Sequence, residues 1–150
     1  MSYTAHKILD GLYQGGMPPP GDGLAKAGID VLVLSAREHQ DFNAYEGLTV
    51  ICAPGDDDAR RHRLDRFIDV WRAAASQVVE HVKAGRKVLV TCMAGQNRSG
   101  LIVSLAVREL TGWSGKKVVE HVSGSRPFAL NNKTFADYIC ESYPNDKDVL

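Results

Sequence analysis

The chain is most informative at residues 92–100, which read Cys-Met-Ala-Gly-Gln-Asn-Arg-Ser-Gly. Residues 87–90 before them (Lys-Val-Leu-Val) are typical of a buried strand, and residues 101–110 after them have the apolar content of a packed helix. The sequence therefore predicts a strand–loop–helix element, in which the backbone N–H groups of the loop and the N-terminus of the helix converge on one point. Such a point attracts anions.

The side chains of this loop suit chemistry on a phosphate. We expect Cys92 to be a thiolate, the nucleophilic form, because it lies near that partial positive charge and near a guanidinium. Arg98 offers a planar fork of donors that fits two phosphoryl oxygens. Gly95 allows the loop a conformation that a side chain would resist, and Ser99 can donate its hydroxyl to a departing sulfur. Cys92, Arg98 and Ser99 are the predicted catalytic residues here, and the predicted substrate-binding residues are Met93, Ala94, Gly95, Gln96, Asn97 and Arg98.

The spacing of cysteine and arginine alone is a weak signal. It also occurs by chance, and a lone cysteine after an apolar strand is usually a small buried hydrophobic residue. The strand before the loop, the Ala-Gly within it, the Arg-Ser-Gly at its end and the helix beyond it together favour the catalytic interpretation.

At this point the chain resembles a known family. Residues 91–100 resemble the signature of the cysteine-dependent dual-specificity phosphatases, within the protein tyrosine phosphatase superfamily. Residues 8–16 resemble the opening hairpin of those domains, residues 24–34 resemble their first helix and the next strand, and residues 132–135 match the Asn-x-x-Phe that opens their last helix. The resemblance covers nearly the whole chain, so residues 1–150 are expected to form one catalytic domain of this type.

The resemblance implies a phosphomonoester hydrolase that forms a phosphocysteine intermediate on Cys92 and uses no metal and no cofactor. It favours a protein tyrosine, serine and threonine phosphatase, with phosphoinositides or RNA 5′-phosphates as alternative substrates. One position departs from the family pattern, because most members carry histidine before the nucleophile and here that residue is Thr91. A catalytically weak phosphate-binding module is therefore an alternative. A sulfur-transferring or arsenate-reducing enzyme with a similar loop is another.

A second loop carries candidates for the general acid, which must protonate the leaving alkoxide or phenoxide. The apolar run 48–53 leads into Pro54-Gly55-Asp56-Asp57-Asp58. In many family members the acid lies three residues after a proline, which indicates Asp57. Counting six residues back from Leu64, the first apolar position of the next helix, indicates Asp58. We favour Asp57 as the catalytic acid, with Asp58 as the alternative; acidic residues here also suit the start of a helix.

Other polar residues have two interpretations each. The basic residues at 60–63 are expected to be solvated and to offset the aspartates, with a grip on anionic substrate as the alternative, and Arg126 is a similar candidate. Asn132 is expected to brace the signature loop, as its family counterpart does, or to cap the last helix. Cys52 is expected to be structural, with a reversible bridge to Cys92 under peroxide as a second hypothesis.

The alternation of apolar strands and amphipathic helices predicts an α/β fold. We expect three layers, with a central and mostly parallel sheet of about four to five strands flanked by helices on both faces. The expected elements are a hairpin within residues 1–16, a short helix over 22–27, strands at 29–34, 48–53 and 87–91, and helices over 64–82, 101–110, 114–122 and 132–142; residues 37–47 are polar and irregular or helical.

The composition restricts the function. The chain has 150 residues, enough for one domain with a buried core. Lys+Arg and Asp+Glu are equal at 18 each, so no net charge attracts the protein to nucleic acid or to a membrane surface. We find no targeting segment, no membrane-spanning run and no disulfide or zinc-site spacing among the three cysteines. We expect a cytoplasmic monomer without a metal, acting on a phosphorylated protein.

Overall fold

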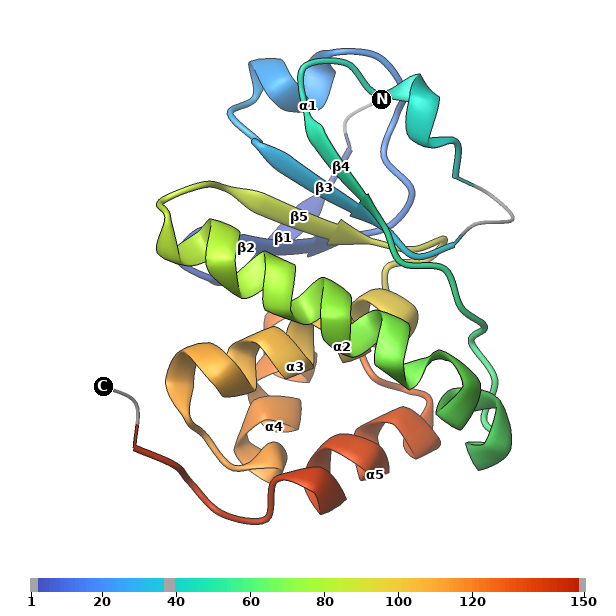
Figure 1. Ribbon diagram of the computed structural model, residues 1–150, viewed down its shortest axis with the longest axis vertical. Helices are drawn as coiled ribbons and strands as arrows, with labels where there is room; N and C mark the ends of the chain where they lie inside the picture. The colour runs from blue at the N-terminus through green and yellow to red at the C-terminus, as the bar shows by residue number, and fades with distance from the viewer. Residues whose placement is uncertain (1–2, 37–39, 149–150) are drawn as a thin grey trace.

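A five-stranded sheet in the order β1-β2-β5-β3-β4 forms the centre of the molecule (Figure 1). This is a computed structural model, and it describes residues 3–36 and 40–148. β1 (Ala5–Leu9) and β2 (Leu12–Gly15) form the predicted antiparallel hairpin, whereas β2, β5 (Val88–Thr91), β3 (Val31–Leu34) and β4 (Thr49–Cys52) run parallel. The predicted α/β fold with a mostly parallel sheet is therefore confirmed, and the antiparallel strand is at an edge.

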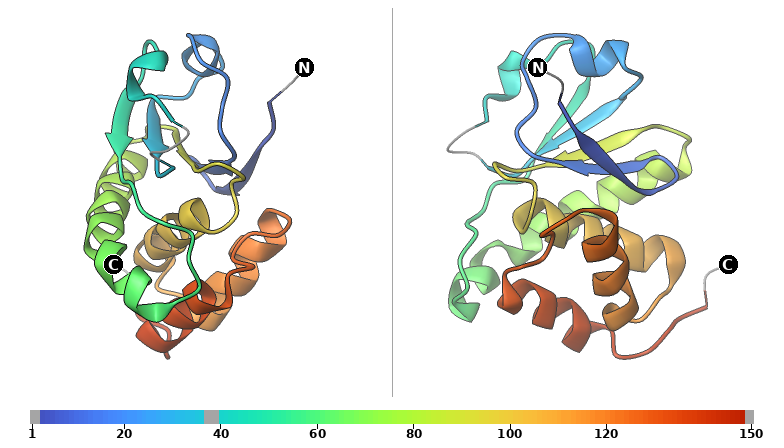
Figure 2. Two further views of the ribbon diagram at one scale, coloured as in Figure 1. Left: turned by 90° about the vertical axis from the view of Figure 1, so that its right-hand side faces the viewer. Right: turned by 180° about the vertical axis from the view of Figure 1, so that it is seen from behind.

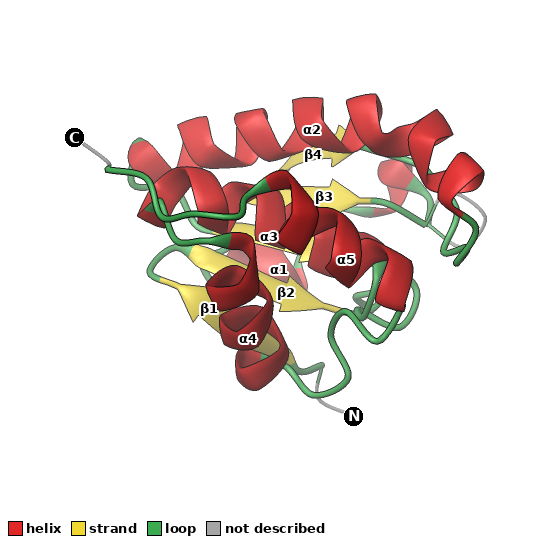
Figure 3. Cartoon of the chain, turned by 90° about the horizontal axis from the view of Figure 1, so that it is seen from below, coloured by secondary structure: helices red, strands yellow, loops and turns green. Residues whose placement is uncertain are grey.

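The helices cover the two faces of the sheet unequally. The long ones, α2 (Arg61–Lys83), α3 (Arg98–Thr111), α4 (Gly115–Ser125) and α5 (Lys133–Ser142), lie together on one face. α2 and α3 pack directly on the sheet, α4 packs on α3 and on β1, and α5 packs on α3 and α4 (Figure 3). The other face is covered by the short α1 (Gly23–Lys26) and the loops around it (Figure 2). Among the helices that the structure describes, none is both long enough and apolar enough to cross a bilayer.

Three helices extend further than the sequence predicted. α2 begins at Arg61 instead of residue 64 and ends at Lys83. α3 begins at Arg98 instead of residue 101, so the end of the signature forms its first turn. α4 continues through Gly124 to Ser125, where the Ser125 hydroxyl donates to the carbonyl of His121. Within the predicted polar segment 37–47, residues 37–39 lie outside the described residues, and a short 3-10 turn forms at Phe42–Ala44.

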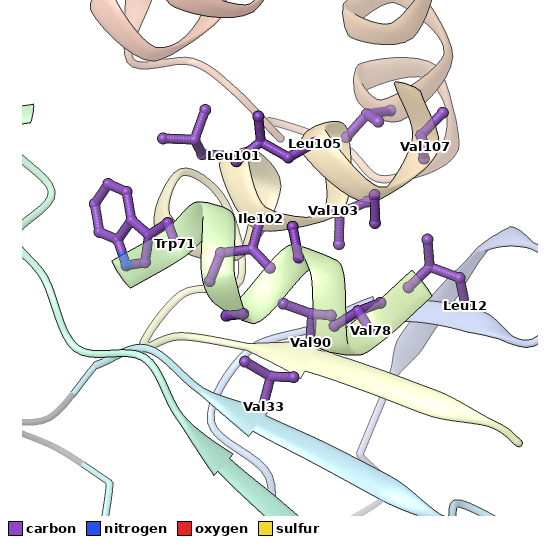
Figure 4. Packing of buried hydrophobic residues seen from close by; sticks show 14 of the residues in the cluster. Leu12, Val33, Trp71, Val78, Val90, Leu101, Ile102, Val103, Leu105 and Val107 are labelled. Atoms are coloured by element: carbon purple, nitrogen blue, oxygen red, sulfur yellow. The ribbon is translucent and has the colours of Figure 1, made fainter. Parts of the chain in front are cut away.

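The side chains of the parallel strands alternate between two apolar clusters. Leu12, Val33 and Val90 point toward α2 and α3, where they meet Val78 and Ile102 (Figure 4). Leu32, Leu34 and Leu89 point to the opposite face and pack with Leu24 of α1. Both faces of the central strands are buried, which is why their sequences are almost continuously apolar.

Trp71 connects this core to the loop that follows β4. Its indole is fully buried, and its Nε1 donates to the carbonyl of Ala53 at 2.9 Å. It packs edge-on against Phe135, with ring centroids 5.5 Å apart. Gly55 lies so close to the indole that a Cβ there would be 2.3 Å from Trp71 Cζ2. The loop carrying the three aspartates is thus packed directly on the core.

Candidate active site

The carboxyl ends of the four parallel strands meet at one edge of the sheet, which is where open α/β sheets commonly bind ligands. β5 ends at Thr91, and residues 92–97 lead from it into α3. The end of β2 at Gly15 flanks this loop on one side and the end of β3 flanks it on the other. The loop of residues 53–60, which follows β4, lies beyond β3.

The carbonyls of the loop are bonded to the elements around it. Met93 O accepts from Met17 N at 3.0 Å, Ala94 O from Arg126 Nη2 at 3.2 Å, Gly95 O from Arg126 Nε at 2.6 Å, Gln96 O from Leu130 N at 3.1 Å and Asn97 O from Leu101 N at 2.8 Å. In a planar trans peptide the N–H points away from the preceding C=O. Because these carbonyls face outward, the N–H groups of residues 94–98 turn to the inner side of the loop.

Gln14 and Arg126 hold the back of the loop. Gln14 is fully buried on β2, and its Nε2 donates to Gly95 O and to Ser99 Oγ, at 3.1 Å each. Arg126 donates to the carbonyls of Ala94 and Gly95 and to His6 Nδ1, so its guanidinium is committed to the loop backbone. The interpretation of Arg126 as a grip on substrate is therefore not supported. Gln14 was missed, although a polar residue within an apolar strand was an available signal.

Gly95 is required by two independent constraints. Its φ of +70° lies in the left-handed region, and a Cβ there would be 2.4 Å from the carbonyl carbon of Gly15 and 2.5 Å from Gly16 N. Tyr3 holds Gly16 in place beside Gly95, because the Tyr3 hydroxyl donates to Gly16 O at 2.8 Å. Burial raises the pKa of Tyr3, which keeps this hydroxyl protonated as a donor.

The three predicted catalytic residues of the loop lie together at its base. Cys92, Arg98 and Ser99 are all buried, and Cys92 Sγ lies 3.3 Å from Ser99 Oγ. Because Ser99 Oγ accepts from Gln14, its own hydrogen is available to a thiolate at Cys92. Arg98 Nη1 donates to Gly55 O at 3.3 Å, which connects the base of the loop to the loop of aspartates.

Thr91, at the position where the family pattern has histidine, is fully buried. Its hydroxyl donates to Val33 O at 2.7 Å and accepts from Gln40 Nε2 at 2.8 Å. Gln40 Oε1 in turn accepts from Ala36 N at 2.9 Å. These bonds connect the end of β5 to β3. The strand that leads to Cys92 is therefore held by a threonine and a glutamine, at a place where the family pattern has a histidine.

Two of the three aspartates are paired with arginines. Asp56 forms an ion pair with Arg63. Asp58 accepts hydrogen bonds from the guanidinium of Arg60, at 2.7 Å, and from its backbone N–H, at 2.8 Å, and these bonds lower the pKa of Asp58. A carboxylate held as an anion in this way is a poor proton donor. The pairing favours Asp57 over Asp58 as the acid, and Arg60 and Arg63 offset aspartates as the sequence suggested.

Asp57 is held by neutral amides. Its Oδ2 accepts from Asn97 Nδ2 and its Oδ1 from Asn132 Nδ2, at 2.9 Å each. Asn132 also caps α5, because its Oδ1 accepts from Thr134 N at 3.1 Å and from Phe135 N at 3.4 Å. The side chain of Asn132 therefore caps α5, and only its backbone N–H bonds to the signature loop, at Asn97 Oδ1 and 2.8 Å. The structure places Asp57 against Asn97 of that loop.

Cys52 lies too far across the sheet to bridge to the nucleophile. It pairs with Leu34 on β3, and Leu34 pairs with Thr91 on β5. Two strand spacings, about 9.5 Å, separate the backbones of Cys52 and Thr91. A disulfide needs its Cα atoms within about 7 Å. The hypothesis of a Cys52–Cys92 bridge is not supported.

Within residues 3–36 and 40–148, no three His, Cys, Asp or Glu side chains are grouped as metal ligands would be.

Comparison with known proteins identifies the fold. No protein-family model and no curated protein matches the sequence. Human DUSP28 is 21% identical, with a TM-score of 0.71 over 96% of this chain and 95% of that chain. A mouse protein assigned as a dual specificity phosphatase, in complex with zinc tungstate, is 21% identical, with a TM-score of 0.75 over 96% and 89%. The human tyrosine phosphatase-like serine/threonine/tyrosine-interacting protein is 19% identical, with a TM-score of 0.72 over 92% and 94%.

The chain therefore has the fold of the dual-specificity phosphatases, as the resemblance implied. At these identities the likeness shows the fold alone. An assignment of activity depends on the site.

We predict that Gly95→Ala disrupts the loop. The new Cβ meets the backbone at Gly15 and Gly16, so the free energy of unfolding should fall by about 1–3 kcal/mol and tungstate binding should weaken at least about tenfold. Gly124→Ala is the matched control, because a Cβ there meets nothing within 4 Å. It should leave binding unchanged. Urea denaturation measures the free energy of unfolding, and calorimetric titration measures tungstate binding. Equal effects of Gly95→Ala and Gly124→Ala would contradict the prediction.

Proposed function

We propose that this protein is a phosphomonoester hydrolase of the dual-specificity phosphatase type, which forms a phosphocysteine on Cys92. The observation that carries the proposal is the position of the Cys92 sulfur, at the base of a loop whose outward carbonyls turn its N–H groups inward. Arg98, in the first turn of α3, adds a guanidinium to the same point. A tetrahedral oxyanion fits such a cradle, and the mouse protein with this fold was crystallised with tungstate.

The first step transfers the phosphoryl group to sulfur. The Cys92 thiolate attacks phosphorus in line, an S–P bond forms and the P–O bond to the leaving group breaks. The N–H groups of residues 94–98 and the guanidinium of Arg98 hold the equatorial oxygens as their charge changes. Asp57 gives its proton to the leaving oxygen, which departs as an alcohol or a phenol.

The second step hydrolyses the phosphocysteine. Asp57, now a carboxylate, takes a proton from a water molecule whose oxygen attacks phosphorus, and the S–P bond breaks. Ser99 keeps its proton and donates a hydrogen bond to the sulfur as it departs as a thiolate, for which its 3.3 Å distance from Cys92 Sγ is suitable. The products are inorganic phosphate and an enzyme ready for another cycle, with no metal in either step.

The surroundings of the loop favour a phosphoprotein as substrate. Met93 and Ala94, at the exposed part of the loop, are neutral. Arg126 is bonded to loop carbonyls, and the arginines within residues 60–63 pair with nearby carboxylates. A polyanionic phosphoinositide or RNA end gains little extra binding from arginines whose donors are already bonded to carboxylates or to backbone carbonyls. We infer that the substrates are phosphotyrosine, phosphoserine and phosphothreonine in proteins of the cytoplasm, where a catalytic thiolate stays reduced.

The fold alone does not distinguish a hydrolase from a phosphate-binding module, since one protein with this fold is named as tyrosine phosphatase-like. Asp57 beside the loop and Ser99 beside the sulfur favour hydrolysis. A module that only binds phosphate needs neither a proton donor nor a group that assists sulfur.

Replacement of the nucleophile tests the proposal directly. Cys92→Ser should reduce hydrolysis of 4-nitrophenyl phosphate by at least about 10³-fold, because the covalent step is lost. It should still bind tungstate in calorimetry, since the loop backbone is unchanged. Cys52→Ser is the matched control and should retain full, vanadate-sensitive activity. Activity that persists in Cys92→Ser would refute the proposed function.

The two candidate acids can be separated by matched variants. Asp57→Asn should lower kcat for phenyl phosphate by about 10²-fold, because the leaving phenoxide then departs without a proton. Asp58→Asn should change kcat less than about threefold, since Asp58 is bound to Arg60 and does not serve the reaction. Steady-state kinetics measure both, and a larger loss for Asp58→Asn would reverse the assignment.

A substrate panel tests the inferred substrate class. Phosphate release from phosphotyrosine, phosphoserine and phosphothreonine peptides should exceed release from phosphoinositide vesicles and from RNA with a 5′-phosphate by at least about tenfold in kcat/KM, because the loop offers little extra charge to a polyanion. Equal or faster release from either polyanion would show that the substrate class is wrong while the hydrolase assignment stands.

A further inference from the structure

Asn97 has an unusual place in the loop. It precedes α3 at the N-cap position, where an asparagine side chain ordinarily accepts from the first turn of its own helix, but it makes no such bond. Its side chain is buried and instead bonds to three residues in two other segments. Nδ2 donates to Asp57 Oδ2 at 2.9 Å and to Asn131 Oδ1 at 2.6 Å, and Oδ1 accepts from Asn132 N at 2.8 Å. These partners fix the orientation of the amide, because a flipped amide would face two oxygens with its own oxygen.

The bond to Asp57 connects the proposed acid to the phosphate cradle. Asn97 is the neighbour of Arg98, so a carboxylate bonded to Asn97 has a fixed position relative to the group that holds the phosphoryl oxygens. Asn132 holds the other oxygen of Asp57 from the start of α5. Each carboxyl oxygen has two lone pairs, so Asp57 can keep both amide bonds while it exchanges a proton with a leaving oxygen.

We propose that Asn97 is the positioning residue for Asp57, which it holds on the leaving-group side of the cradle through the Nδ2–Oδ2 hydrogen bond. The inference rests on the proposed function and adds to it. Asn97 then contributes to protonation of the leaving group through its side chain, in addition to the part that its backbone N–H takes in phosphate binding. Misplacement of a catalytic group by about 1 Å can cost about 10²-fold in rate, so loss of this bond is measurable.

Asn131 provides a matched control. It bonds to Asn97 and, through its own Nδ2, to Gln96 Oε1 at 3.1 Å. Asn131→Ala therefore removes support from the same part of the loop but leaves the bond between Asn97 and Asp57. If Asn97 only shaped the loop, the two alanine variants would have effects of the same kind.

The test compares two esters that differ in their need for a proton. Phenoxide leaves poorly without one, whereas 4-nitrophenoxide needs little assistance. Asn97→Ala should lower kcat for phenyl phosphate at least about tenfold and for 4-nitrophenyl phosphate less than about threefold, with KM and tungstate affinity nearly unchanged. In an Asp57→Asn background, Asn97→Ala should cause no further loss on phenyl phosphate, because the group it positions is already gone. Asn131→Ala should leave the ratio of the two rates as in the wild type.

Each other outcome has a distinct meaning. An equal loss on both esters, repeated by the same factor in the Asp57→Asn background, would overturn the role of Asn97 while the hydrolase assignment stands. A wild-type protein that hydrolyses neither ester, or hydrolysis that persists in Cys92→Ser, would overturn the proposed function itself. Asn97→Ser, which is smaller and polar, supplies the same comparison if thermal unfolding shows that Asn97→Ala does not fold.

Discussion

The loop after β5 can turn its N–H groups inward only if its carbonyls are bonded outward. A buried carbonyl without a donor costs about 1–3 kcal/mol, so a loop with several of them would not keep this conformation. The donors are Met17 N, Gln14 Nε2, two nitrogens of Arg126 and Leu130 N. They come from the end of the hairpin and from the segment between α4 and α5. The anion site is therefore a property of the whole fold, because no single strand–loop–helix element contains these donors.

The segment between α4 and α5 carries backbone strain where it serves the loop. Phe128 and Leu130 have φ values of 65° and 61°, which are unfavourable for residues with a side chain. Such residues cost about 1–3 kcal/mol each and persist when their surroundings fix them. Leu130 is buried, lies against Gly100 of α3, and its N–H donates to Gln96 O. The packing against α3 thus holds the strained segment in the position from which Arg126 and Leu130 reach the loop.

The sequence predicted the parts of the site that depend on local pattern. An apolar strand, a Cys-x5-Arg spacing and an apolar helix lie next to one another in the chain, so residues 92–99 could be identified from periodicity and chemistry alone. The contact between Gln14 and the loop could not be predicted. A polar residue within an apolar strand marks Gln14 as unusual, but it does not indicate a partner 81 residues away at Gly95. The role of Arg126 could not be predicted for a related reason. Its charge suggested an anion, but only the tertiary packing decides that its guanidinium faces backbone carbonyls. The start of α3 was placed late because the apolar pattern begins at Leu101, whereas the geometry of the loop sets the first helical residue at Arg98.

The three consecutive aspartates show how their surroundings assign different roles to identical side chains. Asp56 and Asp58 each face an arginine, which supplies a full positive charge, and the hydrogen bonds from Arg60 lower the pKa of Asp58. These ion pairs suit a structural role at the start of α2. Asp57 is bound instead by the amides of Asn97 and Asn132. The proposed cycle needs a carboxyl that faces first a leaving oxygen and then a water molecule, and the bond to Asn97 places Asp57 beside the phosphate loop. The proposed catalytic carboxyl therefore differs from its two neighbours in its partners. Asp57 is bonded to amides, whereas Asp56 and Asp58 are bonded to guanidinium groups.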